Sequence, residues 1–526
     1  MTPDDAAVPA LPARRPAWLD VAALVAFVVL AYAASVSRAW LSYDDDWLVR
    51  DNPVMREASP RALGAIVGDL SVPTRLALGA EYLPVRDVCV WLEVRAFGDS
   101  PWPMRALSIV LYAAACALLL LWARRVPLVP LLAVWLFALH PVHVESVAWL
   151  AGRKDQLALL FTVAALLAYA SERVALRRAL VPLLVALACF SKATSVVVPA
   201  LLVAHDALTR RRPDRLALGL ASIPAALAAL VHMHVGGLVS MYAQLPGGSH
   251  AAAIATMAPV FWRYVALSFG AVRVSLVHAV PVRTLAEPVA LAALAALAAF
   301  AWRRGERRPG VALAWFCVAL LPVSQVLAPL QNRMADRYLL VAVFGPCLAL
   351  GAVVEAVAAL ARARMGAALR VTVVASCLLL TVPYAALFAE PLALFSDLCL
   401  RAPASPLGPY QLAMALRDAG RLDEVEGAFR EAMRRDHFRT SAGRRAANNL
   451  ALLLAQMGRR QEAIYVLRKA HLASPEDPKV LHNLAVLLDD TGAHAEARPM
   501  FEELIRRFPG YEPGREAYRR RVGPLP

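Results

Sequence analysis

The feature that most constrains this sequence is a succession of apolar runs over its first 390 residues, most of them close to the length of a membrane-crossing helix. About 20 apolar residues in helical form span the hydrocarbon core of a bilayer. Hydrophobic residues make up 60% of the 526 residues and charged residues only 18%, and the mean hydropathy is +0.54. This profile indicates a polytopic membrane protein and excludes an ordinary soluble one.

Basic residues lie mainly in the short connections between the runs or in the C-terminal part, and those in the connections follow the positive-inside rule. The net charge of +15 therefore needs no nucleic acid to explain it, and no nucleic-acid-binding motif is recognisable. Arg14-Arg15 and Arg124-Arg125 place the N-terminus and the alternate connections in the cytoplasm. We expect about eleven membrane helices, with the C-terminus outside, near residues 18–36, 104–122, 128–139, 156–170, 180–190, 194–205, 216–235, 288–302, 311–327, 338–360 and 371–389.

Three stretches allow more than one interpretation. The first run could be a cleaved signal peptide, but we favour an uncleaved anchor because many further spans follow it. Residues 180–190 and 194–205 are each short for a span, and we expect a helical hairpin whose tip presents Lys192 outward or within a cavity. Residues 257–280 carry charges, so we expect this stretch to be interfacial or re-entrant.

Two stretches are predicted to lie outside the membrane as loops, residues 42–103 and 140–155. The first begins with the acidic run Asp44-Asp45-Asp46, directly after a membrane-length segment. Placing an ionisable group close to lipid costs free energy, so such a group usually has a function. The alternative is a solvated flank that ends the helix. A loop as long as residues 42–103, neither low in complexity nor rich in charge, is more often functional than idle.

The predicted topology brings four polar sets to the outer face. Carboxylates beside cations at a membrane surface suit the transfer of a group from a lipid-linked phosphate, because a carboxylate can accept a hydroxyl proton while Arg and Lys stabilise the departing phosphate. Any one set taken alone is better explained as an ion pair that closes a loop, but four sets on one side favour the functional interpretation. The sets are Asp44 to Asp46; His140, His143 and Glu145 with Arg153, Lys154 and Asp155; Lys192; and Arg333 to Tyr338 with Asp336 and Arg337.

The sequence does not point firmly to a metal or another cofactor. His140, His143 and Glu145 are ligand types, but their spacing within a loop is weak evidence, and a divalent metal is less favoured than a hydrogen-bonding role that shapes the site. The seven cysteines are scattered, without a CxxC or Cys/His cluster. Cys89 and Cys399 fall in predicted external segments, and whether they pair is open.

After Pro391 the hydropathy falls and a repeat of about 34 residues begins, which is the tetratricopeptide period. Asn449-Leu450-Ala451 recurs as Asn483-Leu484-Ala485, and Gly458 recurs as Gly492. An earlier unit around Gly420 fits at a looser spacing. Stacked helix pairs of this kind form a groove for a peptide or protein partner. The repeats carry no catalytic constellation, so we interpret them as a binding module.

Several of these motifs occur together, and in the same order, in one known family. Tyr43-Asp44-Asp45 with Asn52-Pro53, the string ALHPVHVESVAWLAGRKDQLA at 138–158, Ser191-Lys192, and Met334-Ala335-Asp336-Arg337-Tyr338 resemble bacterial relatives of the transmembrane and tetratricopeptide repeat-containing protein O-mannosyltransferases. The resemblance implies a GT-C fold, a polyprenyl-phosphate sugar as donor, and inversion at the transferred sugar carbon. It also implies the inner membrane, with the site and the repeats on the periplasmic side.

The same resemblance suggests roles for individual residues. Asp44 or Asp45 would be the catalytic base, and Lys192 and Arg337 would contact the donor phosphate. Tyr82 and Arg86 would belong to an acceptor loop. The chain departs from the family pattern at Arg105, Ser108 and Tyr112, where relatives tend to show a His, Asn and His series, and at Ala193. The remaining candidates would contact the donor or shape the site: His140, His143, Glu145, Arg153, Lys154 and Asp336.

The sequence thus predicts an all-α protein with three parts: a GT-C-like membrane domain over 1–390, a linker over 391–407, and a tetratricopeptide-repeat α-solenoid over 408–526. The predicted function is transfer of a sugar, with mannose expected, from a polyprenyl phosphate to a hydroxyl, such as a Ser or Thr of an exported protein held by the repeats. Membrane lipid is the remaining expected partner. The alternative from another class is a non-catalytic membrane scaffold that acts through its repeats.

Overall fold

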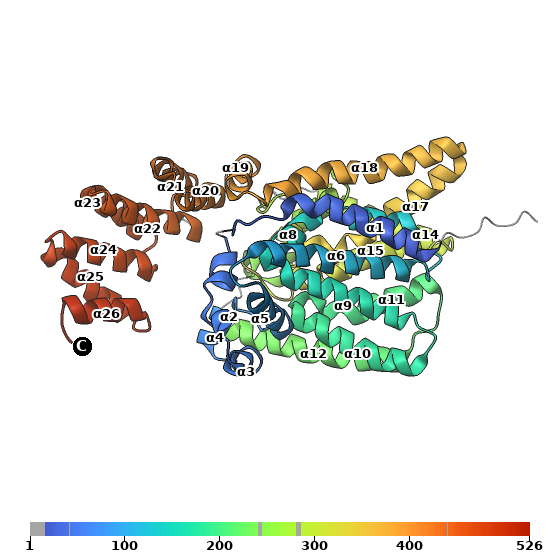
Figure 1. Ribbon diagram of the computed structural model, residues 1–526, viewed down its shortest axis with the longest axis horizontal. Coiled ribbons are helices and arrows are strands. Elements are labelled where there is room, and N and C mark those ends of the chain that lie inside the picture. Colours follow the sequence, from blue (N-terminus) through green and yellow to red (C-terminus); the bar gives the residue numbers. More distant parts are fainter. Residues whose placement is uncertain (1–15, 42, 240–244, 280–285, 439, 526) are drawn as a thin grey trace, which may run out of the picture. The chain divides into compact units, whose positions relative to one another are not determined.

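The computed structural model describes residues 16–41, 43–239, 245–279, 286–438 and 440–525, and the regular structure over these residues is helical (Figure 1). The chain forms two compact units. The first contains the residues up to Arg38, the segment Trp47–Val274 and the later chain up to Ala386. The second contains Ala39–Asp46, a few residues after Val274 and everything from Leu387 onward. The predicted all-α class is confirmed.

Six helices of the described residues are long and apolar enough to cross a membrane. Two bent pairs raise the number to eight if each is one span: Leu131–Ala138 with Pro141–Ala148, and Asp336–Ala342 with Phe344–Leu360. The predicted number of eleven crossings is not established, and it stays a prediction. The six are α1 (Ala17–Tyr32) with the turn Ala33–Ser35, α6 (Pro101–Ala123), α10 (Val174–Ser191), α12 (Arg215–Leu238), α13 (His250–Ser268) and α18 (Ala363–Leu387).

The structure differs from the predicted spans at two places. Residues 257–280 were expected at the interface, but α13 has the length and composition of a crossing helix. Lys192 directly follows α10, which is longer than the apolar run and begins at Val174, but α10 packs against α12 rather than against the helix after Lys192, so the expected hairpin of two packed helices does not form. Shorter apolar helices fill the remaining predicted segments: α11 (Val198–Thr209), α14 (Ala286–Arg303) and α15 (Arg308–Leu320).

Small residues let the apolar helices of the first unit approach closely. α17 (Phe344–Leu360) packs between α7 (Leu131–Ala138) and α15. A Cβ added at Gly345 would meet the Ala312 carbonyl oxygen at 2.3 Å, and one at Gly351 would meet the Ala133 backbone nitrogen at 3.0 Å. Helices in membranes associate through such close backbone contacts rather than through a hydrophobic drive.

The predicted first loop, residues 42–103, is largely built of short helices between α1 and α6. They are α2 (Pro53–Arg56), α3 (Pro60–Gly68), α4 (Val72–Ala77) and α5 (Pro84–Phe97), and proline lies in the first turn of each. Proline suits this position because its missing N–H would be unsatisfied there anyway. Asn52 caps α2 and donates to the Ala77 carbonyl at 2.6 Å, which fixes α2 against the end of α4.

Residues 140–155, predicted as an external loop, instead form buried helical turns. The segment contains Pro141–His143, Val144–Ala148 and Leu150–Gly152 and then enters α9 (Arg153–Tyr169). Apart from half-buried Lys154, its side chains are buried. The prediction of a loop fails because the polar residues of this stretch satisfy one another and their neighbours inside the protein, as described below. Burial of polar groups is tolerated when they are hydrogen-bonded.

The first helix of each repeat in the second unit ends at a glycine in the left-handed region. Gly420, Gly458 and Gly492 have φ of 74°, 80° and 83°, which residues with a side chain rarely adopt. The repeated glycines read from the sequence therefore mark the turns between paired helices. The helices are α20 (Leu407–Asp418), α21 (Leu422–Asp436), α22 (Ser441–Gln456), α23 (Arg460–Ala473), α24 (Pro478–Asp490), α25 (His494–Arg507) and α26 (Glu512–Arg521).

The predicted linker 391–407 also differs from the structure. It contains a helix, α19 (Pro391–Arg401), whose Leu394, Phe395 and Leu398 are buried and which packs against α20. A flexible linker would expose such residues. The second unit therefore begins before the first repeat rather than after a spacer.

Gly152 provides a test of the close packing in the 140–155 segment. A Cβ at this position would lie 2.4 Å from the Ser146 carbonyl oxygen, which is backbone and cannot easily move. We expect Gly152→Ala to destabilise the protein by about 1–3 kcal/mol, measured as a lower unfolding midpoint in detergent. Gly68→Ala is the matched control, because nothing lies within 4 Å of its added methyl group. Equal midpoints for the two variants would contradict the packing described here.

Candidate functional site

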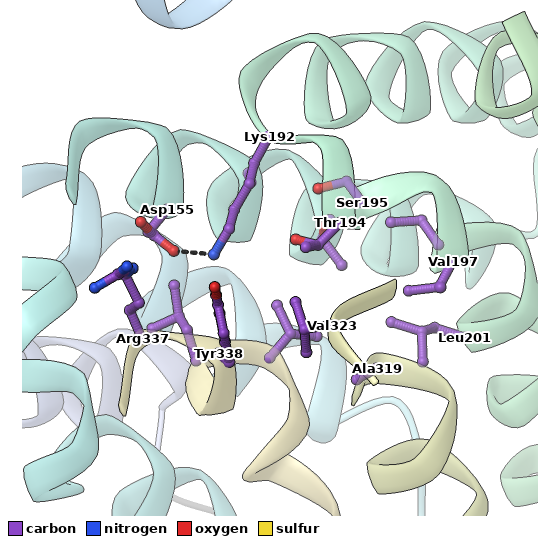
Figure 2. Close-up of a pocket in the computed structure, with 15 residues that line it drawn as sticks. Asp155, Lys192, Thr194, Ser195, Val197, Leu201, Ala319, Val323, Arg337 and Tyr338 are labelled. Carbon is purple, nitrogen blue, oxygen red and sulfur yellow. Dashed lines mark hydrogen bonds and ion pairs between the residues drawn. The ribbon is translucent and has the colours of Figure 1, made fainter. Parts of the chain in front are cut away.

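A narrow cleft opens in the first unit where α9, α10 and α11 meet the chain around Arg337 (Figure 2). We call it the Lys192 cleft. Its unfilled volume, about 20 Å³, has room for about one water molecule. One end is polar and the other is apolar. The polar lining comprises Asp155, Thr162, Lys192, Thr194, Ser195, Arg337 and Tyr338, and the apolar lining comprises Ala158, Val197, Val198, Leu201, Ala319, Val323, Leu340 and Val341.

Lys192 enters the cleft because α10 ends immediately before it. Its backbone is extended, with φ −155° and ψ 129°, so the side chain leaves the helix. The ammonium group donates a hydrogen bond to Oδ1 of Asp155, a buried residue in the first turn of α9. A lysine ammonium has three N–H donors, so two remain for a ligand. The second carboxylate oxygen of Asp155, Oδ2, is buried and has no hydrogen-bond partner in the described part of the chain.

Arg337 is held on the other side of the cleft by Glu145. The buried Glu145 carboxylate accepts hydrogen bonds from the Arg337 guanidinium and, at 3.0 Å, from its backbone N–H. The guanidinium also lies 5.9 Å from the Trp149 ring centre and 5.5 Å from that of Tyr338. In Figure 2 the Tyr338 hydroxyl points toward Lys192. Asp336, next to Arg337, is buried.

Arg153 fixes the start of α9 beneath this cleft. Its Nε and Nη2 each donate to a different oxygen of Glu93 on α5, both at 2.6 Å. Nη1 donates to Gln156 and Ser108, and Nη2 also donates to the Met104 carbonyl. All of these residues are buried. Arg153 therefore shapes the site and has no donor free for a ligand.

Lys154 forms a second ion pair across the same junction. Its ammonium lies 2.6 Å from the Glu81 carboxylate, which also faces Arg86 at 3.5 Å. Burial alone would raise the pKa of Glu81, but the positive charges of Lys154 and Arg86 outweigh it and hold the pKa at about 2. Glu81 is therefore ionised throughout the physiological range.

The three residues considered for a metal site do not converge. Nε2 of His140 lies 3.1 Å from the Ser268 carbonyl oxygen, and Nδ1 of His143 lies 2.6 Å from the Tyr112 hydroxyl. Glu145 is engaged by Arg337. Among the described residues, no group of three His, Cys, Asp or Glu side chains is arranged to hold a metal ion. The two histidines instead shape the bend between α7 and α9.

The positions where the chain departs from the family pattern contact this bend. Arg105, Ser108 and Tyr112 lie on one face of α6, at helical spacing. Arg105 donates to the Ser35 carbonyl at 3.3 Å, Ser108 accepts from Arg153, and Tyr112 meets His143. The contacts of Ser108 and Tyr112 pack the bend against α6, and the contact of Arg105 joins α6 to the turn after α1.

Tyr82 and Arg86, predicted in an acceptor loop, make hydrogen bonds within residues 47–99, and the Tyr82 ring also packs edge-on against Phe190 of α10. The Tyr82 hydroxyl donates to the Val67 carbonyl at 2.8 Å. Arg86 is buried and donates to Asp87 and to the Leu78 carbonyl, both at 2.6 Å. These contacts stabilise the segment, and a role of the two residues toward an acceptor stays a prediction.

Asp44 and Asp45 belong to the second unit, whereas the Lys192 cleft lies in the first. Asp45 is buried and Asp44 is half-buried. Their placement relative to the cleft therefore stays a prediction.

Sequence reasoning missed several residues of the site. Thr194 and Ser195 line the cleft and lie shortly after the Ser191-Lys192 pair that was singled out, so extending that motif would have found them. Glu93 and Glu81, the partners of Arg153 and Lys154, carry no local signal, because their pairing depends on how α5 packs against α9.

A tetratricopeptide-repeat family model matches residues 454–518. The chain is 28% identical over 147 residues to human protein O-mannosyl-transferase TMTC1, which covers 27% of this chain and 16% of the human protein. It is 29% identical over 170 residues to the mouse protein of the same name, covering 30% and 18%. The match thus spans less than a fifth of either relative. Together with the repeats, these matches confirm the predicted relationship to this family.

The ion pair of Glu81 gives a pH prediction. Because the folded-state pKa of about 2 lies below the ordinary 4.5, the charge of Glu81 stabilises the fold fully above pH 4.5, and this contribution is lost as the pH falls through 2. We expect Glu81→Gln to lower the unfolding midpoint at pH 7 by about 2–8 °C, with a smaller gap from wild type at pH 3. Glu476→Gln removes an exposed carboxylate that forms no ion pair with the described residues, and it should show neither effect. A gap that does not depend on pH would contradict this assignment.

Proposed function

We propose that this protein is a membrane glycosyltransferase of GT-C type that transfers mannose from a polyprenyl phosphate to a hydroxyl group of a protein. The relatives are named protein O-mannosyl-transferases, and the described residues include several helices suited to a membrane. The donor, the acceptor and the assignment to GT-C are proposals that rest on the motifs and on the chemistry of the Lys192 cleft.

The observation that carries the proposal is the division of this cleft into a cationic and an apolar end. A polyprenyl-phosphate sugar has the same division, with a charged phosphate beside a hydrocarbon chain. Lys192 and Arg337 supply N–H donors of the kind that bind phosphate oxygens. Val197, Leu201 and Val323 supply the apolar wall that the first isoprene units would contact. The narrow cleft would widen around a donor, and its polar end would receive the phosphate.

The reaction needs a base and a stabilised leaving group. The acceptor oxygen forms a bond to C1 of the sugar as the bond from C1 to the phosphate oxygen breaks. The hydroxyl proton passes to Asp44 or Asp45. The departing lipid phosphate gains negative charge, which Lys192 and Arg337 would stabilise. Asp155 and Glu145 hold these two cations in place before the donor arrives.

The repeats supply the proposed acceptor site. Helix pairs stacked in this way form an extended surface for a peptide, and their core is continuous from Tyr410 to Tyr518. Holding the acceptor protein on a module separate from the cleft would let one enzyme modify several proteins.

Transfer from a radiolabelled polyprenyl-phosphate mannose to periplasmic proteins tests this proposal. The purified full-length protein should transfer label, and Asp44→Asn with Asp45→Asn should abolish transfer without lowering the unfolding midpoint. Asp51→Asn is the matched control, because Asp51 is exposed in the same segment and pairs only with Arg50 among the contacts found. A parallel reaction that contains a metal chelator tests whether the transfer depends on a metal ion. If the double variant still transfers label, the assignment of Asp44 or Asp45 as the base is wrong. If the wild-type protein transfers no sugar from any lipid-linked donor, the alternative of a non-catalytic membrane scaffold is favoured.

Lys192 should affect the donor specifically. Lys192→Met removes the cation that would meet the phosphate, so we expect kcat/KM for the donor to fall by about 10²–10³-fold, with Lys192→Arg recovering part of it. Unchanged kinetics in Lys192→Met would place the phosphate elsewhere.

A further inference from the structure

A second cleft lies in the first unit, where α6, α9 and α11 end. We call it the His205 cleft. It is larger than the first, with a cavity of about 340 Å³. None of the motifs that predict the glycosyltransferase falls in it. Its lining is Arg125, Ala170, Ser171, Glu172, Arg173, His205, Thr209 and Arg211.

Three arginines from three different connections converge on this cleft, and only one has an acidic partner. Arg211 pairs with Glu172 at 2.5 Å. The guanidinium groups of Arg125 and Arg173 make no hydrogen bond or ion pair with the residues that the structure describes, and both side chains are exposed. The cleft therefore carries an excess of two positive charges, each with its donors available.

His205 adds a donor at the buried side of the cleft. The Trp122 Nε1–H can only donate, and it lies 3.1 Å from Nδ1 of His205, so Nδ1 is the acceptor. In the neutral imidazole the proton is then on Nε2. His205 is only 1% exposed, and its Nε2 has no hydrogen-bond partner among the described residues. Because His205 lines the cleft, this N–H is a donor that an acceptor group in the cleft can use.

The position of the cleft relates it to the membrane surface. Asp155 of the Lys192 cleft lies in the first turn of α9, and Ala170 of the His205 cleft directly follows its end. The 17 residues of α9 span about 25 Å at 1.5 Å per residue, which is close to the thickness of the hydrocarbon core. The two clefts therefore lie at opposite ends of α9.

We propose that the His205 cleft binds a phosphate group on the side of the membrane opposite the Lys192 cleft. The positive-inside rule explains why arginines occur in these connections. It does not explain their convergence on a cavity that also holds the unpartnered N–H of a buried histidine. Arg125, Arg173 and His205 offer donors from three directions, which suits the oxygens of a phosphate. The phosphate belongs either to an anionic lipid headgroup or to a soluble compound.

The test uses the full-length protein in a neutral detergent. Its unfolding midpoint is followed during titration with short-chain phosphatidylglycerol, with short-chain phosphatidylcholine, and with inorganic phosphate against sodium chloride of equal ionic strength. We expect one of the two anionic probes to raise the midpoint in a saturable way. Arg125→Gln with Arg173→Gln should weaken that apparent affinity by about a hundredfold, or tenfold for each charged hydrogen bond removed. Both residues lie on the surface, so the variant should still fold.

The matched control is Arg212→Gln with Arg215→Gln, which removes two exposed arginines next to the cleft that do not line it. Its titration should match wild type. A response to phosphatidylglycerol alone assigns a lipid headgroup, and a response to inorganic phosphate assigns a soluble ligand. Equal responses of the two double variants, or no response of wild type to either anionic probe, would overturn the proposal. The measurement involves no sugar transfer, so its outcome is independent of the proposed enzyme activity.

Discussion

The buried ion pair between Arg153 and Glu93 is the interaction on which the Lys192 cleft depends. It joins the first residue of α9 to α5, so the segment before α6 and the membrane helices meet at a fixed point. Removing two charges from water is costly, and the cost is offset only when the geometry is good and the remaining donors are satisfied. Arg153 meets that condition through Ser108, Gln156 and the Met104 carbonyl.

The contacts that fix Arg153 also fix the positions of the two residues that follow it. Lys154 turns toward Glu81, and Asp155 turns toward Lys192. On the opposite side of the cleft, Glu145 holds Arg337 in place through an ion pair. The cleft is thus lined by two cations whose own partners lie within the protein framework. Such preorganisation suits a group that must stabilise developing negative charge without rearranging first.

Much of this architecture could be predicted from the sequence because its signals are local. The apolar runs marked the long helices, the repeated glycines marked the turns of the repeats, and the Ser191-Lys192 pair marked the end of α10. Prediction from the sequence failed where the interacting residues are far apart in the chain. The 140–155 segment reads as a polar loop until Glu93, Ser108 and Arg337 are known to satisfy its charges. Residues 391–407 were predicted to be a linker because the amino-acid composition of this stretch does not reveal the contact of α19 with α20.

The claim that most needs a direct test is that the Lys192 cleft receives the phosphate end of a lipid-linked donor. A polyprenyl phosphate with a photoreactive group in its first isoprene unit, crosslinked to the full-length protein and mapped by mass spectrometry, measures this. The account predicts label on the chain from Val197 to Leu201 and around Val323, reduced by excess unlabelled donor and by Lys192→Met. Label confined to other helices, with these segments unmodified, would contradict it.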